Sequence, residues 1–387
     1  MTIDLAAVRA AIPACQRVTY LNTGWSGPSP SPVVDAIQRQ LELESTEGPA
    51  SPQVIETHHD VDAEARAEAA ALVGASVKEI AMLHNTTEGL HVVLNAFHWE
   101  PGDEVITFRP EHPAVLMSTL LLERKGVTVK VLELAPAEEA PTILSRIELA
   151  MGPRTRLICM SHVQYTSGLR MPLAEICSVA HRLGVQVMVD GAQAVGQMPL
   201  DLPALGVDYY SMPGQKWLLG PDGVGMLYVR ADRLDALEPR NPYLAGLARA
   251  PQGPTTESAR KFELSTSSMA LRAGLTEAIR FIRAVGLDEI RSRNLVLAER
   301  LKKNLGLTEG ASVLSPMAGE SSTGLVSASL AGVTAPAAVG DLWSRWKIAA
   351  RSIQELDAVR VSCHFFNTEQ EIDGVSAALE ELAQGAR

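Results

Sequence analysis

The chain has 387 residues, of which 46% are hydrophobic and 4% aromatic, and its formal net charge is −11. This length exceeds that of one ordinary hydrophobic core and predicts two domains. The acidic balance, the absence of a basic cluster and the scarcity of aromatic rings argue against nucleic acid or an anionic membrane as a partner.

The first two thirds of the chain predict an α/β architecture. A short helix is expected over 4–12, a Gly/Pro/Ser-rich loop over 20–32, and helices over 33–45 and 60–73. Short apolar runs then alternate with helical periods, so strands are expected over 79–83, 104–108, 127–132, 156–161, 185–189, 208–212 and 224–229, with helices over 87–98, 112–125, 142–150 and 172–183. Such alternation implies a mostly parallel sheet covered on both faces. The last strand is expected to be antiparallel, because its connection is too short for a helix.

The last third predicts a smaller α+β domain. A loop rich in Gly, Pro and Ala over 241–256 marks the expected boundary, and 271–306 is expected to form one long helix or two. Strands over 325–330 and 358–363 and a helix over 368–383 follow. We therefore expect an N-terminal segment that packs with the small domain, then a large domain and the small domain, spanning 1–18, 19–245 and 246–387.

The N-terminus and the cysteines indicate a cytoplasmic protein. Residues 1–5 lack the basic start and long apolar run of a secretion signal, and no apolar stretch reaches membrane-spanning length. The four cysteines have neither metal-binding nor disulfide spacing, which suits a reducing compartment where thiols stay free. They are Cys15, Cys159, Cys177 and Cys363.

Two charged residues follow successive predicted strands. Asp190 closes an apolar run, where a carboxylate is partly desolvated and needs a cationic partner. Lys216 follows a Pro-Gly turn after the next strand, where poor solvation lowers the pKa of a lysine. Pyridoxal phosphate (PLP) requires such a pair: a lysine to hold its aldehyde as an imine, and a carboxylate to keep its pyridine nitrogen protonated. Taken singly, Asp190 is more often a helix cap or metal ligand and Lys216 a surface lysine, so the inference depends on the pair.

Other polar residues fall at the carboxyl ends of the predicted strands, where open α/β sheets bind ligands. Thr86 and Thr87 begin a helix, an arrangement suited to a phosphate and equally to a capping box. His112 can lie on the pyridine ring and move protons, or be a structural histidine. Gln193 can contact the cofactor's phenolic oxygen or start a helix. Arg360 interrupts an apolar strand and suits a substrate carboxylate or a structural ion pair.

This ordered series resembles the class V aminotransferase superfamily of PLP enzymes, which includes cysteine desulfurases, cystine C–S lyases and isopenicillin N epimerase-like proteins. The resemblance extends from Tyr20 to the C-terminal helix and rests on 85–89, 111–112, 161–168, 190–193, 214–216, 220–225, 262–266, Arg360 and 367–369. It implies the aspartate aminotransferase-like fold of PLP-dependent transferases: a large domain with a mostly parallel seven-stranded sheet, and a smaller α+β C-terminal domain.

The resemblance implies a role for each residue that handles the cofactor ring. Lys216 forms the imine with PLP, Asp190 pairs with the pyridine nitrogen, His112 stacks on the ring, and Gln193 contacts the phenolic oxygen. The asparagine that usually faces this oxygen is absent, and Gln164 or Thr166 is expected in its place.

The resemblance also implies phosphate and substrate contacts. Thr86 and Thr87 hold the phosphate. Thr266 reaches the phosphate of a neighbouring subunit, since such enzymes are homodimers with shared active sites. Arg360 binds the carboxylate of a small amino-acid substrate. Before the lysine, Pro-Gly-Gln replaces the usual Ser/Thr-Gly-His, so Gln215 can donate a hydrogen bond to the phosphate but cannot carry charge.

The largest departure concerns the mobile cysteine of the desulfurases, which lies on a loop between an Ile-Ala-x-Arg strand and the carboxylate arginine. Here that interval, 352–359, is short and has no cysteine. Cys363 lies past Arg360 in a predicted strand, which is typical of a buried core thiol.

These features favour a C–S lyase that performs β-elimination on cysteine-like or cystine-like substrates. An aminotransferase or an epimerase acting on another α-amino acid uses nearly the same machinery. A non-catalytic binding protein on the same scaffold is a further alternative, favoured by Pro213 and Gln215. Loop residues of this architecture set its specificity, and Asn22, Trp25 and Tyr243 are candidates to line the pocket, with Asn22 the expected substrate contact. The pattern leaves the substrate open.

Overall fold

The computed structural model describes residues 3–238, 257–264 and 266–385. A seven-stranded sheet forms its centre, with strand order β2-β8-β7-β6-β5-β3-β4. The strands are β2 (Ile80–Leu83), β3 (Glu104–Arg109), β4 (Thr128–Glu133), β5 (Thr155–Ser161), β6 (Gln186–Asp190), β7 (Tyr209–Pro213) and β8 (Gly225–Val229). Only β8 runs against its neighbours β7 and β2, which confirms the predicted antiparallel last strand.

Alternation of side chains along the strands gives this sheet two apolar faces. One face packs on α4 (Thr86–Ala96) and α5 (Pro113–Leu120). The other packs on α3 (Pro52–Leu72), α6 (Ala140–Ala150), α7 (Leu173–Arg182) and α10 (Met269–Val285). The short helix α8 (Leu202–Leu205) lies between β6 and β7. The predicted mostly parallel sheet, covered on both faces, is confirmed.

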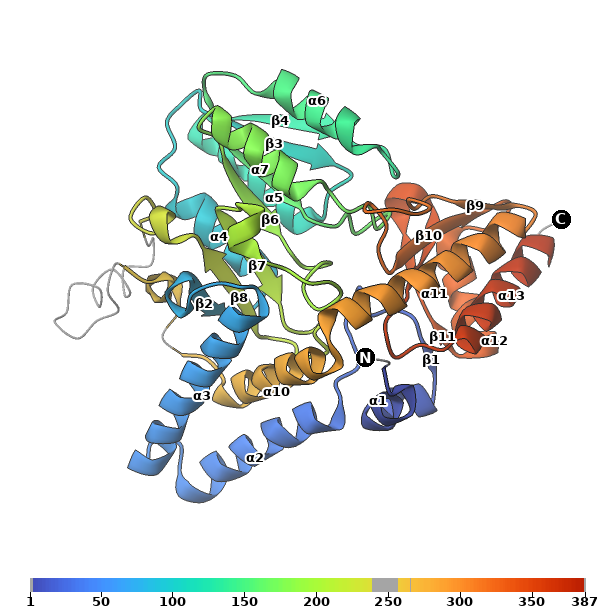
Figure 1. Ribbon diagram of the computed structural model, residues 1–387, viewed down its shortest axis with the longest axis horizontal. Helices are drawn as coiled ribbons and strands as arrows, with labels where there is room; N and C mark the ends of the chain where they lie inside the picture. The colour runs from blue at the N-terminus through green and yellow to red at the C-terminus, as the bar shows by residue number, and fades with distance from the viewer. Residues whose placement is uncertain (1–2, 239–256, 265, 386–387) are drawn as a thin grey trace.

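A second, antiparallel sheet lies in the C-terminal part of the chain, drawn orange and red in Figure 1. Its order is β12-β13-β10-β9, and its strands are β9 (Ala311–Val313), β10 (Leu325–Leu330), β12 (Arg351–Ile353) and β13 (Ala358–Ser362). A separate apolar cluster joins it to α11 (Leu287–Leu307), α12 (Ala335–Trp346) and α13 (Glu369–Gly385).

The N-terminal segment contacts this C-terminal part. Strand β1 (Thr19–Tyr20) pairs in parallel with β11 (Ile348–Ala349). From α1 (Leu5–Ala11), Arg9 forms an ion pair of 3.0 Å with Glu371 of α13. The expected boundary at 245/246 falls within 239–256, outside the described residues, so the division into three parts stays a prediction.

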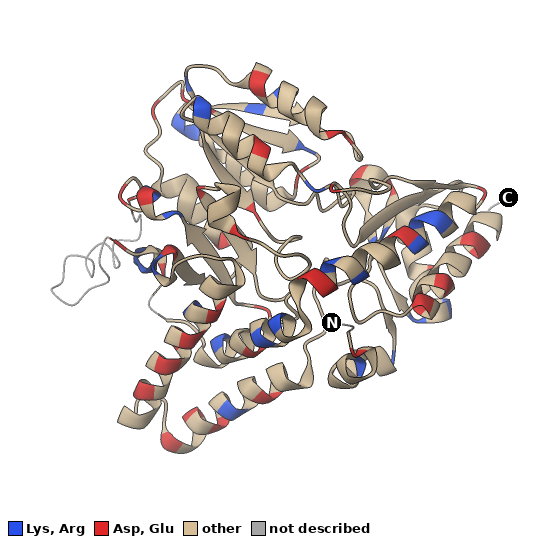
Figure 2. Cartoon of the chain, viewed as in Figure 1, with Lys and Arg blue, Asp and Glu red and all other residues tan. Residues whose placement is uncertain are grey.

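Helices α2 (Ser31–Glu47) and α3 form an arm that reaches away from the sheet, and α10 packs against both (Figure 1). Figure 2 shows mostly acidic residues along α2 and α3 and mostly basic residues along α10. Arg280 of α10, for example, lies 3.1 Å from Glu68 of α3. Among the described residues, no helix has the length and apolar character needed to span a membrane.

Two helices differ from their predicted extent, and of the two alternatives left open for 271–306 the structure shows two helices. The helix predicted from residue 60 begins at Pro52, because the Ser51 side chain accepts a hydrogen bond from the Val54 N–H and caps it. The helix predicted over 112–125 stays α-helical only to Leu120 and then tightens into a 3₁₀ segment. The stretch 271–306 forms two helices because Gly286, at φ +95°, breaks the backbone between them.

Candidate active site

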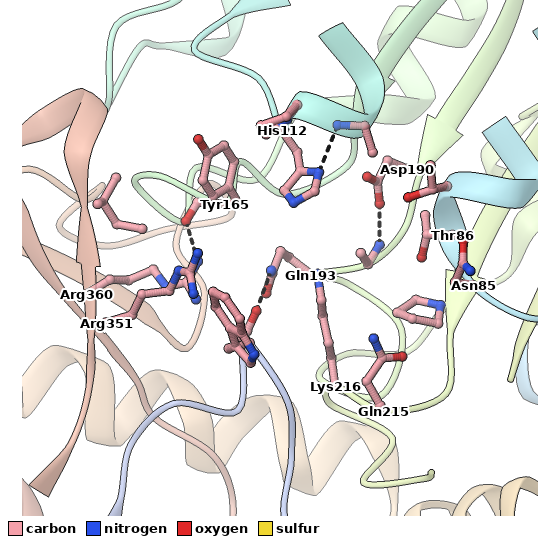
Figure 3. Close-up of a pocket in the computed structure, with 18 of the residues that line it drawn as sticks. Asn85, Thr86, His112, Tyr165, Asp190, Gln193, Gln215, Lys216, Arg351 and Arg360 are labelled. Atoms are coloured by element: carbon pink, nitrogen blue, oxygen red, sulfur yellow. Dashed lines mark hydrogen bonds between the residues drawn. The ribbon is translucent and has the colours of Figure 1, made fainter. Parts of the chain in front are cut away.

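A cavity of about 620 Å³ opens at the carboxyl ends of the parallel strands (Figure 3). Its walls come from the central sheet, the loop after β1 and the hairpin β12–β13. The cavity brings together eight predicted site residues: Thr86, Thr87, His112, Asp190, Gln193, Gln215, Lys216 and Arg360.

Lys216 lies on the turn that follows β7, where Gly214 N–H donates to the Val224 carbonyl at 2.9 Å. Burial lowers the pKa of the Lys216 amine to about 8, with Asp190 opposing this shift and Arg360 and Arg351 adding to it. A lysine with such a pKa keeps an appreciable neutral fraction near pH 7, as a nucleophile and proton carrier requires.

Asp190 ends β6 and is buried, with 4% of its surface exposed. Its Oδ1 accepts a hydrogen bond of 2.8 Å from the Ala192 N–H. That is the only hydrogen bond of the carboxylate within the described part of the chain, so Oδ2 is left for a cationic partner. Asp190 therefore meets the requirement of a protonated ring nitrogen.

The N-terminus of α4 faces the same cavity. Asn85 caps the helix, its Oδ1 accepting from the Glu88 N–H at 2.9 Å. The Thr86 hydroxyl is buried and, within the described residues, has no hydrogen-bond partner. Gln215 also lines the cavity with a buried, unpartnered Oε1, and a rotated amide would present N–H donors instead. Together with the exposed Thr87, this is a site suited to a phosphate.

His112 caps α5 with its imidazole. Nδ1 accepts a hydrogen bond of 3.2 Å from the Ala114 N–H, so this nitrogen is unprotonated. Burial lowers the pKa of His112, which favours the neutral ring. The preceding residue, Glu111, accepts hydrogen bonds from the Ser161 N–H at 2.9 Å and from Gln164 at 3.2 Å, and burial raises its pKa to about 7. His112 is thereby fixed at the cavity wall, with its ring edge-on to Tyr165 at 5.2 Å.

Both polar atoms of the Gln193 side chain form hydrogen bonds with other residues of the protein. Its Nε2 donates to the Gly24 carbonyl and its Oε1 accepts from the Trp217 indole, both at 2.8 Å. The predicted contact with the phenolic oxygen of PLP stays a prediction. Of the two candidates for the missing asparagine, Gln164 and Thr166, both are buried and neither lines the cavity.

Arg360 is 1% exposed and has no ion pair within the described part of the chain. Its Nη1 donates to the Tyr165 carbonyl at 2.7 Å, while Nε and Nη2 have no partner among the described residues. Burial, reinforced by Arg351, lowers its pKa to about 9. The alternative of a structural ion pair is therefore not realised in the described residues, and the free edge of the guanidinium suits a carboxylate.

Two predicted residues lie outside the cavity, and a third is not among the described residues. Asn22 does not line the cavity, whereas Gly24 and Trp25 from the same loop do. Thr266 is exposed and outside this cavity. Tyr243 lies outside the described residues.

Sequence reasoning missed Tyr165, Arg351 and Glu355, which all line the cavity. Arg351 follows an apolar run, so it carried the same signal as Arg360, an arginine beside buried residues. Glu355 and Tyr165 carried no such signal, because their position depends on how the hairpin β12–β13 folds against the loop after β5.

No cysteine lines the cavity, and all four are buried. The hairpin closes tightly through the turn Gln354–Leu356 and Asp357, whose φ is +41°. Cys363 follows β13, and burial raises the pKa of its thiol to about 12. The expectation of a short, cysteine-free hairpin and a buried Cys363 is confirmed.

The fold and this cavity together define a PLP-dependent enzyme with the aspartate aminotransferase-like fold. A family model described as Aminotransferase class-V matches residues 19–375, and the chain belongs to that family. PLP is its cofactor, and the non-catalytic alternative is not supported.

Named relatives differ in activity. The isopenicillin N epimerase of Streptomyces clavuligerus is 32% identical over 333 residues, 82% of this chain and 84% of that protein. A probable cysteine desulfurase of Mycolicibacterium paratuberculosis is 31% identical over 414 positions, covering 99% of this chain. This chain spans only 58% of that relative's length. A solved structure of the cystine C–S lyase C-DES with its product cysteine persulfide has a TM-score of 0.90 and 29% identity, covering 96% of this chain and 99% of that one.

Proposed function

We propose that this enzyme is a C–S lyase that removes the Cβ substituent from cysteine-like or cystine-like amino acids. The observation that carries the proposal is the wall formed by β12–β13, which retains Arg360 with an unpaired guanidinium edge but offers no thiol to the cavity. A desulfurase that stores sulfur on its own cysteine requires such a thiol, whereas an elimination does not. The similarity to the lyase C-DES supports the same choice.

We assign the ring contacts of the cofactor to residues of this cavity. Asp190 holds the proton on the pyridine nitrogen, and His112 lies against the ring face. Lys216 holds the aldehyde carbon. Gln193, or a residue it positions, serves the phenolic oxygen. When bound, PLP withdraws electrons from the substrate and makes its Cα proton acidic.

The phosphate contacts follow from the N-terminus of α4. Thr86 and Thr87 donate to the phosphate through their hydroxyls and the helix N–H groups, and Gln215 donates through its amide. Thr266 is exposed, as a contact to a second subunit requires. We therefore propose a homodimer with shared sites. A cytoplasmic location agrees with its four free cysteines.

The remaining residues handle the substrate. Arg360 orients its carboxylate. Lys216, once the substrate amine has displaced it from the cofactor, would take the proton from Cα. The Cβ–S bond then breaks with its electron pair on sulfur. For cystine the leaving group is cysteine persulfide, and the remaining three-carbon fragment takes up water to give pyruvate and ammonia.

The test is incubation of the holoenzyme with cystine and a panel of S-substituted cysteines. We expect equal amounts of pyruvate, ammonia and persulfide or thiol. Lys216→Ala should reduce turnover by at least about a thousandfold, as loss of a nucleophile and proton carrier does. Lys303→Ala, at a lysine with 70% of its side chain exposed, is the matched control and should leave turnover unchanged. Absence of pyruvate across the panel would contradict the proposal.

Epimerisation is the second candidate, favoured by the 32% identity to isopenicillin N epimerase. The reaction products distinguish epimerisation and transamination from elimination. Incubation in deuterated water with an amino acid that lacks a leaving group would give deuterium at Cα and racemised substrate for an epimerase. An aminotransferase would instead give an oxo acid that depends on a second oxo acid as acceptor.

A further inference from the structure

The lysine and the arginines that line the cavity lie away from its phosphate-binding end. They are Lys216, Arg351 and Arg360. Figure 3 shows the two arginines on one side of the cavity and Thr86 and Gln215 on the other. Lys216 is assigned to the aldehyde carbon of the cofactor. Among the described lining residues, no lysine or arginine therefore remains to neutralise a phosphate.

The donors at the phosphate-binding end belong to uncharged groups. In the first turn of α4, the Asn85 side chain accepts a hydrogen bond of 2.9 Å from the Glu88 N–H. The N–H groups of Thr86 and Thr87 have no acceptor in the described part of the chain, and the buried Thr86 hydroxyl has no partner there. The N-terminus of a helix carries roughly half an elementary positive charge. This turn therefore offers a ligand several hydrogen bonds but less than one full charge.

Gln215 adds a further uncharged donor from the turn that carries Lys216. Its backbone carbonyl accepts a hydrogen bond of 2.6 Å from the Gly27 N–H, which holds the turn against the loop after β1. Its side-chain Oε1 is buried without a partner among the described residues. The amide can rotate to present its N–H groups here, but it carries no charge at any pH.

Two carboxylates oppose a second negative charge at this end. Glu88 lies in the first turn of α4. It accepts a hydrogen bond of 2.7 Å from the His84 N–H and lies 2.9 Å from the His84 ring, so a protonated His84 is already paired. Asp190 is buried and lines the same cavity. Burying a charge without a compensating cation is costly, so these surroundings disfavour a doubly charged phosphate.

We propose that this end of the cavity binds the singly charged form of the cofactor phosphate, and that Gln215 is the residue that determines this selectivity. A phosphate monoester loses its second proton near pH ~6, so in water it is mostly doubly charged at pH 8. The described residues supply hydrogen bonds for one charge and no cation for a second. The inference rests on the phosphate contacts proposed above and does not depend on which substrate the enzyme uses.

Phosphorus-31 NMR of the holoenzyme measures the charge of the bound phosphate, because the resonance of a phosphate monoester shifts when the second proton is lost. In the wild-type enzyme we expect the position of the singly charged form at every pH from about 6 to about 8.5. Gln215→Arg should move the resonance to the doubly charged position, because a guanidinium supplies the missing charge. This variant should also bind PLP about tenfold tighter at pH 8, the gain expected for one charge-assisted contact.

Gln354→Arg is the matched control. Gln354 lines the same cavity, but from the hairpin that carries Arg351 and Arg360. The control therefore adds the same charge to the cavity at a distance from the phosphate, and it should leave the resonance at the position of the singly charged form. The wild-type spectrum decides the question by itself if Gln215→Arg does not fold.

The spectrum separates failure of this inference from failure of the contacts beneath it. A doubly charged resonance in the wild-type enzyme that does not change with pH would overturn the inference and leave the phosphate contacts standing. A resonance that titrates near pH ~6, as that of a phosphate monoester in water does, would refute the contacts and the inference together.

Discussion

At the scale of single residues, the chemistry depends on how the protein environment changes ordinary side chains. Lys216 is an unremarkable lysine in the sequence. Burial lowers its pKa and Asp190 raises it, with a net result of about 8. The ordinary value for a lysine is about 10.4, so the cavity makes the free amine available near neutral pH.

This balance predicts the pH dependence of Lys216 in the cofactor-free protein. Labelling by trinitrobenzenesulfonate, followed on the Lys216 peptide by mass spectrometry, should reach half its maximal rate near pH 8. Asp190→Asn should move that midpoint to lower pH, because the carboxylate that stabilises the ammonium is gone. An unchanged midpoint, or one moved upward, would show that Asp190 does not act on this amine.

The sequence was sufficient for residues that follow a strand of the central sheet, such as Asp190 and Lys216, because the carboxyl ends of parallel strands meet at one edge. It was insufficient for Glu355, which comes from a hairpin of another sheet and reaches the cavity only because that sheet packs on the first. Arg351, on the same hairpin, shared with Arg360 the signal of an arginine beside buried residues, but its place at the cavity also depends on this packing. The Gln193 contacts to Gly24 and Trp217 are likewise long-range and had no local signal.

At the scale of elements, α4 is positioned by a close approach to β7. The Ser211 hydroxyl donates to the Thr86 carbonyl at 2.9 Å. A Cβ on Gly89 would lie 2.2 Å from that hydroxyl oxygen and 2.9 Å from the Ser211 Cβ. Glycine at this position therefore lets the helix present its N-terminus to the cavity.

Gly89→Ala should push α4 away from β7 and disturb the phosphate site. We expect a loss of about 1–3 kcal/mol in the free energy of unfolding, as for other overpacked cores, together with weaker binding of PLP. Gly340→Ala in α12 is the matched control, since nothing lies within 4 Å of the added Cβ. It should stabilise the protein by roughly 0.5–1 kcal/mol. Urea unfolding and PLP titration measure both effects. Equal behaviour of the two variants would refute the role of Gly89.

Element prediction succeeded where apolar periodicity was long and failed where elements were short. All seven strands of the central sheet were predicted within about two residues, as their buried runs allow. Strands β9 and β12 have three residues each and carry no periodic signal. They exist because β10 and β13 offer them hydrogen-bonding edges.

At the scale of the whole molecule, the turn that carries Lys216 is tied to the C-terminal sheet. His364, just past β13, is fully buried, with its ring 5.0 Å from the Trp217 ring and Nε2 3.1 Å from the Trp217 carbonyl. Burial lowers the pKa of His364 to about 3. The histidine is therefore neutral in the folded state between about pH 3 and about pH 6.5, where an unfolded chain protonates it.

The sign of the resulting pH effect is definite. Below the ordinary histidine pKa of about 6.5, the unfolded state binds a proton at this histidine and the folded state does not. The free energy of unfolding therefore falls as pH decreases from 6.5 toward 3. One such group contributes up to about 1.4 kcal/mol per pH unit. His364→Gln should reduce that slope in urea unfolding between pH 6.5 and 4, whereas His98→Gln, at an exposed position, should not. Identical slopes for all three proteins would contradict this account.

The placement of the four thiols has a practical consequence. Each lies inside an apolar cluster, and burial raises the pKa of every one, to about 11 for Cys15 and about 12 for Cys159, Cys177 and Cys363. Maleimides and iodoacetamide react with accessible thiolates, so none of the four cysteines is a ready target for them. A thiol reagent can therefore be added during the assay to trap a thiol product as the enzyme releases it. The reagent should not inactivate the enzyme through its cysteines.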